Sequence, residues 1–599
     1  MGLASNPGHA RGMPIWQRRA LVLALNITTT PFLLWQFYLF YEPDGISALE
    51  FLILACTFFC VPWSVLNFWN AIITLCLLGF GNPEESVYPY FKGKGELPDI
   101  SSKTALVFFL RNEDPGPLFD RILAMHKSLR DTKQVQHFRF VLLSDTSQED
   151  VAKMEEQRFA QLRDEIAKGM SRPPFYRRRR ENVAWKAGNL RDYLDHHSGG
   201  DDFFIPLDQD SAMAGELLVR MVSSMEKHSR IGIMQTLCYG MPAASAFTRL
   251  YQFGIRQSMQ TYNLGNSWWT DDCGLYWGHN AIIRTDAFRK HCVLPKLPGK
   301  PPLGGYILSH DLVEAMFMRS AGYEVRIVPC ETQSYETHPP TLIDYLRREL
   351  RWCQGTMQYW FLLTRPGLHP LSRFHACQTL ATYLTQAVQA TMAFATIVNV
   401  LSGGASSSAE ALARFYALQL TITVIGDGCK IAGHVNVALT SLPRYGGLMN
   451  WTLSVLVEAL LLFPLAAITA VSVFHFFVKL MLTGKTISWD GQNRDRLGLS
   501  WRSALEALWP HTVIGLSCIA AMVGIEHDDS TLRWGWLWAI SLSMAAPYAV
   551  LTASPRFGRL ITHFRLFADP EELMLPAILS TLIPKEIKPV KVEKASIVK

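Results

Sequence analysis

The stretch Asp202-Phe-Phe-Ile-Pro-Leu-Asp-Gln-Asp210 decides the fold. Its first part, 202–207, has the length and apolar character of a buried strand, and two carboxylates separated by one residue follow it. Comparable apolar runs and helical patterns alternate along residues 83–345: Ala105–Leu110, Phe138–Leu143, Asp150–Lys168, Gly215–Lys227 and Ile231–Gln235. Alternation of strands and helices predicts an α/β domain with a mostly parallel sheet.

The sequence on both sides of this domain is apolar. The 599-residue chain is 49% hydrophobic but only 18% charged, whereas soluble domains carry about a quarter charged residues. A bilayer span takes about 20 apolar residues. Segments of this kind lie at Leu21–Tyr41, Phe51–Phe80, Thr379–Leu401, Tyr416–Leu439, Trp451–Leu482, Val513–Ile525 and Trp534–Leu551. We therefore expect a polytopic membrane protein with the α/β domain inserted between transmembrane helices.

Charge predicts the orientation of these spans. The segment before the first span is basic, and the loop after it has Glu42 and Asp44 but no Lys or Arg. Basic segments stay in the cytoplasm, so we expect the N-terminus, the α/β domain and the tail 554–599 there, the tail being mobile. An even number of spans must then follow the domain, whereas five apolar segments do. We therefore expect 451–482 to be either a hairpin or one span plus an interfacial helix. The net charge of +6 gives no indication of a nucleic-acid partner.

Acidic residues follow three of the expected strands. Asp208 and Asp210 follow one, Asp145 follows a second, and Glu113 follows a third. The carboxyl ends of parallel strands meet at one edge of a sheet, where α/β domains bind their ligands. Carboxylates at that edge suit Mg²⁺ or Mn²⁺ bound to a diphosphate. Each motif taken alone is also compatible with a solvated acidic turn.

Three further motifs have side chains suited to a sugar nucleotide. In Ser-His-Asp at 309–311, Asp311 either favours the start of a helix or takes a proton from a hydroxyl as a general base. In Arg-Arg-Glu-Leu-Arg-Trp at 347–352, a helix puts Arg348 and Trp352 on one face. That face fits either a diphosphate and a sugar or a lipid surface. Trp277-Gly-His-Asn280 offers groups for sugar hydroxyls, or forms a turn.

Together these motifs resemble those of processive family 2 glycosyltransferases, which have an Asp, a DxD, a late Asp and a Q/RxxRW helix before the membrane. The corresponding residues are Asp145, Asp208 with Asp210, Asp311, and 348–352, where Arg348 replaces the Gln of cellulose synthases. A narrower resemblance is to the glucans biosynthesis glucosyltransferase H family, the membrane synthases of osmoregulated periplasmic glucans. The runs that carry it are Tyr276–Arg284, Ile307–Asp311, Ser334–Glu336 and Arg351–Gly355.

The resemblance implies a GT-A (Rossmann-like) fold, UDP-glucose as donor, Mg²⁺ or Mn²⁺ as cofactor, and inverting, processive transfer into a β-1,2-linked glucan that crosses the cell inner membrane. The metal would be held by Asp208 and Asp210, and the base would be Asp311. The nucleotide sugar would be bound by Glu113, Asp145, Lys186, Asp208, Arg348 and Arg351. The acceptor would be bound by Trp277, His279, Asn280, His310 and Trp352.

The chain is thus divided into a cytosolic N-terminus with two spans (1–82), a glycosyltransferase domain (83–345), interfacial helices (346–375), transmembrane helices with a gating-type loop at 484–506 (376–553), and a cytosolic tail (554–599). The expected partners are UDP-glucose, the growing glucan, the lipid bilayer, acyl carrier protein and periplasmic glucan-processing proteins. The alternatives are a related synthase of cellulose, hyaluronan or chitin, and a transporter or receptor whose domain has lost catalysis.

Overall fold

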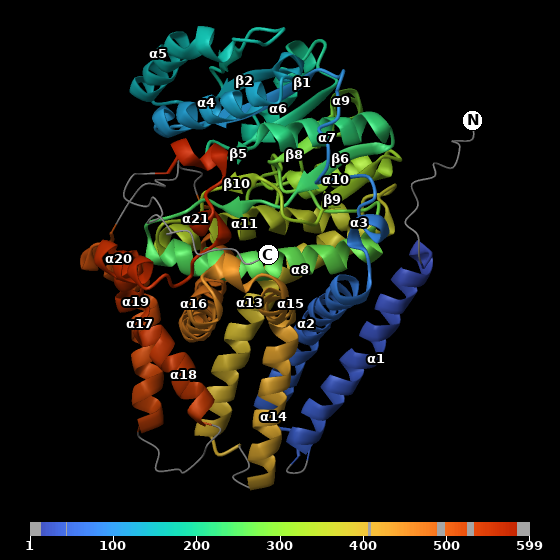
Figure 1. Ribbon diagram of the computed structural model, residues 1–599. Coiled ribbons are helices and arrows are strands. Elements are labelled where there is room, and N and C mark those ends of the chain that lie inside the picture. The colour runs from blue at the N-terminus through green and yellow to red at the C-terminus, as the bar shows by residue number, and fades with distance from the viewer. Residues whose placement is uncertain (1–12, 43–44, 405–408, 488–497, 524–531, 584–599) are drawn as a thin grey trace.

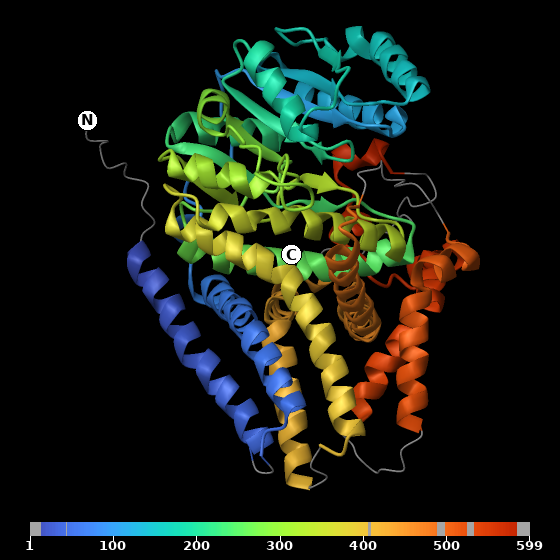
Figure 2. The same ribbon diagram turned by 180° about the vertical axis from the view of Figure 1, so that it is seen from behind.

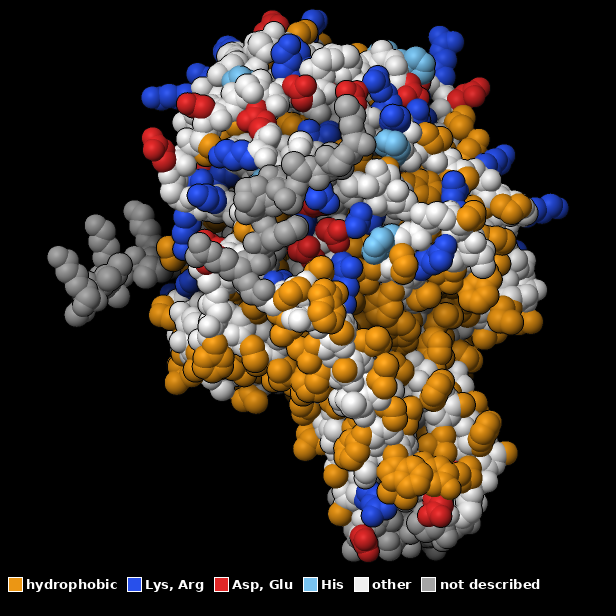
Figure 3. Space-filling view, turned by 90° about the vertical axis from the view of Figure 1, so that its right-hand side faces the viewer, with side chains coloured by type: hydrophobic (Ala, Val, Ile, Leu, Met, Phe, Trp, Pro, Cys, Tyr) orange, Lys and Arg blue, Asp and Glu red, His pale blue; other side chains and the backbone are white. Residues whose placement is uncertain are grey.

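The computed structural model describes residues 13–42, 45–404, 409–487, 498–523 and 532–583. It has an α/β half and a half made of long helices, and two helices lie along the boundary between them (Figures 1 and 2). Charged side chains gather on the α/β half, and hydrophobic side chains cover most of the other (Figure 3). This division confirms the membrane protein with an inserted α/β domain.

The α/β half is built on a seven-stranded sheet in the order β3-β2-β1-β4-β8-β6-β9. Neighbouring strands are parallel except β8, which is antiparallel to both β4 and β6. The strands are β1 Thr104–Leu110, β2 Phe138–Ser144, β3 Phe175–Arg178, β4 Phe203–Leu207, β6 Ile231–Thr236, β8 Ala281–Arg284 and β9 Glu324–Val328. The four strands expected from the sequence are therefore confirmed in a Rossmann-like mixed sheet. The short strand β8 and the edge strands β3 and β9 are additions to that expectation.

Alternate residues of each strand face opposite sides of the sheet, so β1 contributes to two cores. Leu106 and Phe108 pack with α4 and α7 on one side. Ala105 and Val107 pack with α6, α9 and α10 on the other. The helices of this half are α3 Pro83–Ser86, α4 Pro115–Asp131, α5 Glu149–Ile166, α6 Trp185–His196, α7 Gly215–Lys227, α9 Thr285–His291 and α10 Asp311–Ser320. A small second sheet has the order β5-β10-β7, with β5 Ala212–Met213, β10 Ser334–Glu336 and β7 Tyr239–Gly240.

Two helices, α8 (Ala246–Thr270) and α11 (Leu342–Thr356), lie along the boundary between the halves (Figure 1). The carbonyls at the end of α8 accept from Arg18 and Arg19 of the first long helix, for example Arg18 Nη1 to Trp268 O at 3.1 Å and Arg19 Nη2 to Thr270 O at 3.0 Å. Cations there satisfy free carbonyls and the negative end of the helix dipole. The N-terminal helix is thereby fixed to the α/β half.

The other half consists of α1 Ile15–Tyr41, α2 Ala48–Phe80, α12 Trp360–Leu363, α13 Pro370–Leu401, α14 Ala409–Gly426, α15 Gly428–Thr440, α16 Leu448–Thr483, α17 Trp501–Val523, α18 Leu532–Ser543 and α19 Ala545–Ala553. In the described part of the chain, five helices are long and apolar enough to cross a membrane, and the bent pair α18 and α19 makes up to six. The segment 416–439, expected as one span, is divided between α14 and α15 at Asp427.

Helix α16 is a single uninterrupted helix, not a hairpin or a span followed by a second helix. Trp451 near its start packs in a cluster with residues of α8, and Phe476 near its end packs in a core cluster of the α/β half. Both ends therefore lie against the α/β half. Accordingly, Figures 1 and 2 show α16 nearly end-on, whereas α13 runs lengthwise. Helix α16 is also one of the five described helices that are long and apolar enough to cross a membrane.

The chain after the last long helix returns to the α/β half through α20 Pro555–His563, α21 Pro570–Leu573 and the 3₁₀ turn Ala577–Thr581. Glu571 and Glu572 pair with Arg256 and Arg249 of α8 at 2.8 and 2.7 Å. Leu579 is fully buried in the core that contains α4. The tail was expected to be mobile; as far as residue 583 it is docked, and 584–599 lie outside the described residues.

Gly265 allows α8 and α2 to approach closely. A Cβ at this position would lie 2.1 Å from the backbone oxygen of Asn70. Gly265→Ala should therefore separate the two helices and destabilise the fold by about 1–3 kcal/mol, the usual cost of overpacking. Thermal unfolding of the detergent-solubilised protein measures this. Gly79→Ala on α2, where a Cβ meets no atom within 4 Å, is the control, and equal stability of the two variants would contradict the packing.

Candidate active site

The acidic motifs lie at the carboxyl edge of the main sheet. Asp208 follows β4, Asp145 follows β2, and Glu113 follows β1. The Asp145 backbone N–H donates to Leu110 O at 2.8 Å, which joins the ends of β1 and β2. Gln209, with its amide oriented by hydrogen bonding, donates to Glu113 Oε2 at 2.8 Å and so joins the loops after β1 and β4.

Asp145 is buried and held by a cation that follows β3. Arg179 Nε and Nη2 donate to Asp145 Oδ1 and Oδ2, both at 2.7 Å, and Asn189 Nδ2 donates to Oδ1 at 2.9 Å. A bidentate guanidinium–carboxylate pair fixes both partners. Arg179 belongs to a run of four arginines at 177–180. It reaches Asp145 because β3 adds to the sheet beside β2.

Lys186 joins the DxD motif to the loop before β8. Its Nζ lies 2.5 Å from Asp208 Oδ1 and donates to Gly278 O at 3.0 Å. Gly278 has φ +85°, and a Cβ there would lie 2.0 Å from Asp311 Oδ1. Asp208, Lys186 and Asp311, which the sequence separates widely, therefore meet around one glycine.

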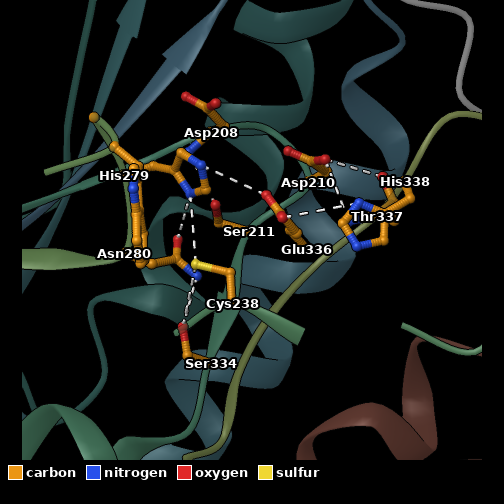
Figure 4. Close-up of polar contacts among 12 residues, drawn as sticks. Asp208, Asp210, Ser211, Cys238, His279, Asn280, Ser334, Glu336, Thr337 and His338 are labelled. Carbon is orange, nitrogen blue, oxygen red and sulfur yellow. Dashed lines mark hydrogen bonds and ion pairs between the residues drawn. The ribbon is translucent and has the colours of Figure 1, made fainter. Parts of the chain in front are cut away.

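Figure 4 shows the polar groups beside the DxD motif. Asp210 Oδ2 accepts from Thr337 Oγ1 at 3.0 Å. His279 Nε2 lies 3.5 Å from Glu336 Oε2. Burial raises the pKa of Glu336, while His279 and Arg348 act in the opposite direction. Glu336 and Thr337 come from β10 and the residue after it, so the small second sheet supplies part of the site.

The loop before β8 carries three of the residues expected to contact the acceptor. Trp277 and His279 are half-buried, and the Trp277 N–H donates to Gln235 Oε1 at 3.0 Å. Asn280 is fully buried, and its Nδ2 donates to Ser334 Oγ at 2.9 Å. Asn280 thus supports the loop from within, and its side chain does not face solvent as an acceptor contact requires.

Helix α10 begins at Asp311, whose side chain is 26% exposed. His310, also expected at the acceptor, is buried and lies 3.3 Å from Asp311 Oδ1 and 3.0 Å from Glu314 Oε2 through its Nδ1 atom. His310 therefore faces two carboxylates beneath the surface. Glu314 carries no recognised motif in the sequence, and only its spacing of three from Asp311 could have pointed to it.

Helix α11 places Arg348 and Arg351 in different surroundings. Arg348 is buried, donates to Tyr251 Oη at 2.8 Å and stacks on Trp352 with 4.5 Å from Cζ to the ring centroid. It holds the aromatic ring and packs against α8, whereas a diphosphate contact was expected. Arg351 is half-buried, and the Trp352 side chain is exposed.

The loop after α16 begins beside α11. Ile487 N–H donates to Gln354 Oε1 at 2.7 Å, two residues after Trp352. Of the gating-type loop 484–506, residues 488–497 lie outside the described residues. Gln354 was not expected as a site residue; it belongs to the run Arg351–Gly355, which carried the resemblance.

Asp208 and Asp210 offer two carboxylates at the strand end, which fits a hard divalent cation. Asp208 already accepts a cationic partner, Lys186 Nζ. Within the described part of the chain, the group with three potential ligand atoms close together is His310, Asp311 and Glu314, and it includes neither aspartate of the DxD motif. Two aspartates fit a metal that takes its remaining ligands from a diphosphate.

The sequence is similar to known glycosyltransferases over nearly its whole length. The family model described as Glycosyl transferase family 2 matches residues 110–292, and Glycosyl transferase family group 2 matches residues 203–484. Glucans biosynthesis glucosyltransferase H from Xanthomonas euvesicatoria pv. vesicatoria (strain 85-10) is 34% identical over 95% of this chain and 90% of its own length. The protein of that name from Xylella fastidiosa (strain 9a5c) is 32% identical over 88% and 84%.

Among solved structures, the chain is similar to the mannosyltransferase PcManGT from Pyrobaculum calidifontis in complex with GDP-Man and Mn²⁺. The identity is 17% and the TM-score 0.39, covering 65% of this chain and 98% of that one. A similarity this remote carries no inference about the donor or the metal.

Gly278→Ala should abolish most glycosyl transfer without unfolding the protein. The added Cβ would displace the Asp311 carboxylate, and a displacement of about 1 Å at a reacting group costs roughly 100-fold in rate. Gly322→Ala is the matched control, since Gly322 has φ +91° but no atom within 4 Å of an added Cβ. Initial rates of both variants measure the effect, and equal losses would mean that backbone strain alone is responsible.

Proposed function

Because the chain belongs to the glucans biosynthesis glucosyltransferase H family of family 2 glycosyltransferases, we propose that it polymerises glucose from UDP-glucose into the β-1,2-linked backbone of osmoregulated periplasmic glucans. Transfer is processive and inverts the configuration at C1 of glucose. The observation that carries this proposal is the meeting of Asp208, Lys186 and Asp311 around Gly278. Asp208 would hold the metal-bound diphosphate, Lys186 supplies a positive charge, and Asp311 is the candidate base. All three would then lie around a single sugar position.

The donor end of the proposed site is formed by the strand-end acids. Glu113 and Asp145 are assigned to the uridine, and Asp208 and Asp210 would hold Mg²⁺ or Mn²⁺. When bound, such an ion supplies positive charge that stabilises the departing diphosphate. Lys186 adds a fixed positive charge beside Asp208, and Arg351 of α11 is assigned to the same phosphates.

In the transfer step, Asp311 is assigned the role of base. Its carboxylate accepts the proton of the acceptor 2-hydroxyl while that oxygen forms a bond to C1 of glucose. The bond between C1 and the diphosphate oxygen breaks, and its electron pair leaves with UDP. Attack opposite the leaving group gives the inverted β-linkage. Trp352, which is 43% exposed, supplies an aromatic face on which the acceptor sugar can stack.

The membrane half is assigned to export of the glucan. Trp352 and Gln354 lie on α11, between the α/β half and the long helices, so the acceptor end of the site faces the boundary. We place the protein in a cell inner membrane with the α/β domain on its cytoplasmic side. The basic N-terminus and the contact of Arg18 with α8 agree with this orientation. The growing glucan and the lipid bilayer are the other partners proposed here. Acyl carrier protein and periplasmic glucan-processing proteins remain expectations from the family.

Purified protein given UDP-glucose and Mg²⁺ should make a β-1,2-linked glucan, which linkage analysis identifies. Asp311→Asn should lower the rate by roughly 10²–10⁴-fold, the contribution of a general base. Asp286→Asn, on a side chain that is 88% exposed on α9, should leave the rate unchanged. Activity with a different UDP-sugar alone would refute the donor, and an unimpaired Asp311→Asn variant would refute the base.

Removal of divalent cations by a chelator should stop UDP release, and Mg²⁺ or Mn²⁺ should restore it. Asp208→Asn should need more metal for half-maximal rate, because one carboxylate ligand is lost. A metal titration of UDP release in both proteins measures the difference. Undiminished turnover after chelation would remove the metal from the proposal.

A further inference from the structure

The first turn of α10 places an imidazole against two carboxylates. His310 precedes the helix, Asp311 opens it, and Glu314 lies three residues further on the same side. The side chain of Glu314 is 2% exposed and that of His310 is 7%, whereas that of Asp311 is 26% exposed. The proposed base is thus the outer member of a cluster whose other two members cannot reach a bulky acceptor.

Both carboxylates approach the same ring nitrogen. His310 Nδ1 lies 3.0 Å from Glu314 Oε2 and 3.3 Å from Asp311 Oδ1. A proton relay through imidazole uses both ring nitrogens. Because the same nitrogen faces both carboxylates at ion-pair distance, the geometry fits an electrostatic bridge between them and not a relay.

The charges around the imidazole favour its protonated form. Burial lowers the pKa of His310, but Glu314 and Asp311 outweigh burial and raise it to about 9, against a smaller lowering by Lys186 of α6. Burial raises the pKa of Glu314, and His310 opposes that shift. Neutral groups also lie near these carboxylates: Tyr276 is a buried phenol, and the Cys292 thiol donates to Glu314 O. At neutral pH an imidazolium therefore lies between the two carboxylates.

Asp311 is confined on a second side. The backbone of Gly278 lies so close that a Cβ there would meet Asp311 Oδ1 at 2.0 Å. The imidazolium and the glycine together leave the carboxylate little freedom. A general base acts efficiently only when it is held within hydrogen-bonding reach of the proton it takes, so a group that fixes the carboxylate contributes to the rate.

We propose that Glu314 and His310 are positioning residues: Glu314 holds the His310 imidazolium against Asp311 Oδ1, and this aims the Asp311 carboxylate at the acceptor hydroxyl. The inference rests on the proposed function, because it takes Asp311 as the base. His310 then supports Asp311 from beneath the surface, whereas the sequence suggested that His310 contacts the acceptor.

The first test is Glu314→Gln, measured as kcat and KM for UDP-glucose over a range of pH. We expect kcat to fall about 10-fold or more, as for partial loss of a general base, with KM little changed. Activity requires the protonated imidazole, which is present below its pKa. Removing the Glu314 charge, which raises that pKa, should move the alkaline fall in activity to lower pH. Glu314→Asp keeps the charge and should keep the alkaline limit near that of the natural protein.

The second test replaces the titrating group itself. His310→Asn offers an amide N–H near the position of Nδ1 but cannot lose a proton, so the alkaline fall in activity should disappear while part of kcat remains. This variant decides the matter if Glu314→Gln fails to fold. Glu324→Gln is the matched control, since Glu324 is also mostly buried and pairs with Arg326 at 2.7 Å, but lies at the amino end of β9, at the opposite edge of the sheet from the site.

Several outcomes separate the inference from the proposed function. A kcat that falls equally at all pH in Glu314→Gln, or an unchanged alkaline fall in His310→Asn, would overturn the positioning role. Unchanged kcat in Glu314→Gln, with Asp311→Asn inactive, would overturn it as well and leave the base assigned to Asp311. Full activity of Asp311→Asn would overturn the proposed function instead.

Discussion

Gly278 has no side chain, and the arrangement of the candidate active site depends on that. Its backbone, at φ +85°, accepts from Lys186 on one side and lies against Asp311 on the other. Strand β8 brings it there. Because β8 is antiparallel to β4, its amino end lies at the carboxyl end of β4, directly beside Asp208. A loop that precedes a strand thus reaches the edge where the acids follow their strands. One reversed strand therefore joins the candidate donor groups to the candidate base.

The same site is fixed to the membrane half through helices that lie along the boundary. Helix α8 is held by Arg18 at its end and by Glu571 and Glu572 of the returning tail. Helix α11 presents Trp352 on one face and receives the Ile487 N–H on Gln354. Buried ion pairs stabilise little in total, but breaking one leaves an unpaired charge. They therefore specify how the halves sit on each other more than they stabilise either. A glucan leaving the acceptor end would therefore emerge where the α/β half is fixed to the membrane half.

Much of the fold followed from patterns within short windows. Apolar runs of strand length predicted β1, β2, β4 and β6, and the acids behind them marked the correct edge, because parallel strands share an edge whatever their order. Contacts between distant segments escaped prediction. The pair of Asp145 with Arg179 needs β3 to add beside β2, and the burial of Arg348 among aromatic rings needs α8 beside α11. The packing of α16 against α8 and against the α/β core is of the same kind, because it too joins segments that are far apart in the chain.

The sequence by itself determined that this protein has an α/β domain between apolar helices, and which carboxylates follow its strands. Local propensity and hydrophobic periodicity suffice for that, since each depends on neighbouring residues only. Tertiary structure alone decided which of those groups face one another. His310 turned towards Glu314, Asn280 towards Ser334 and Lys186 towards Asp208. Burial and approach of backbones set these contacts, and both arise only when segments far apart in the chain pack together.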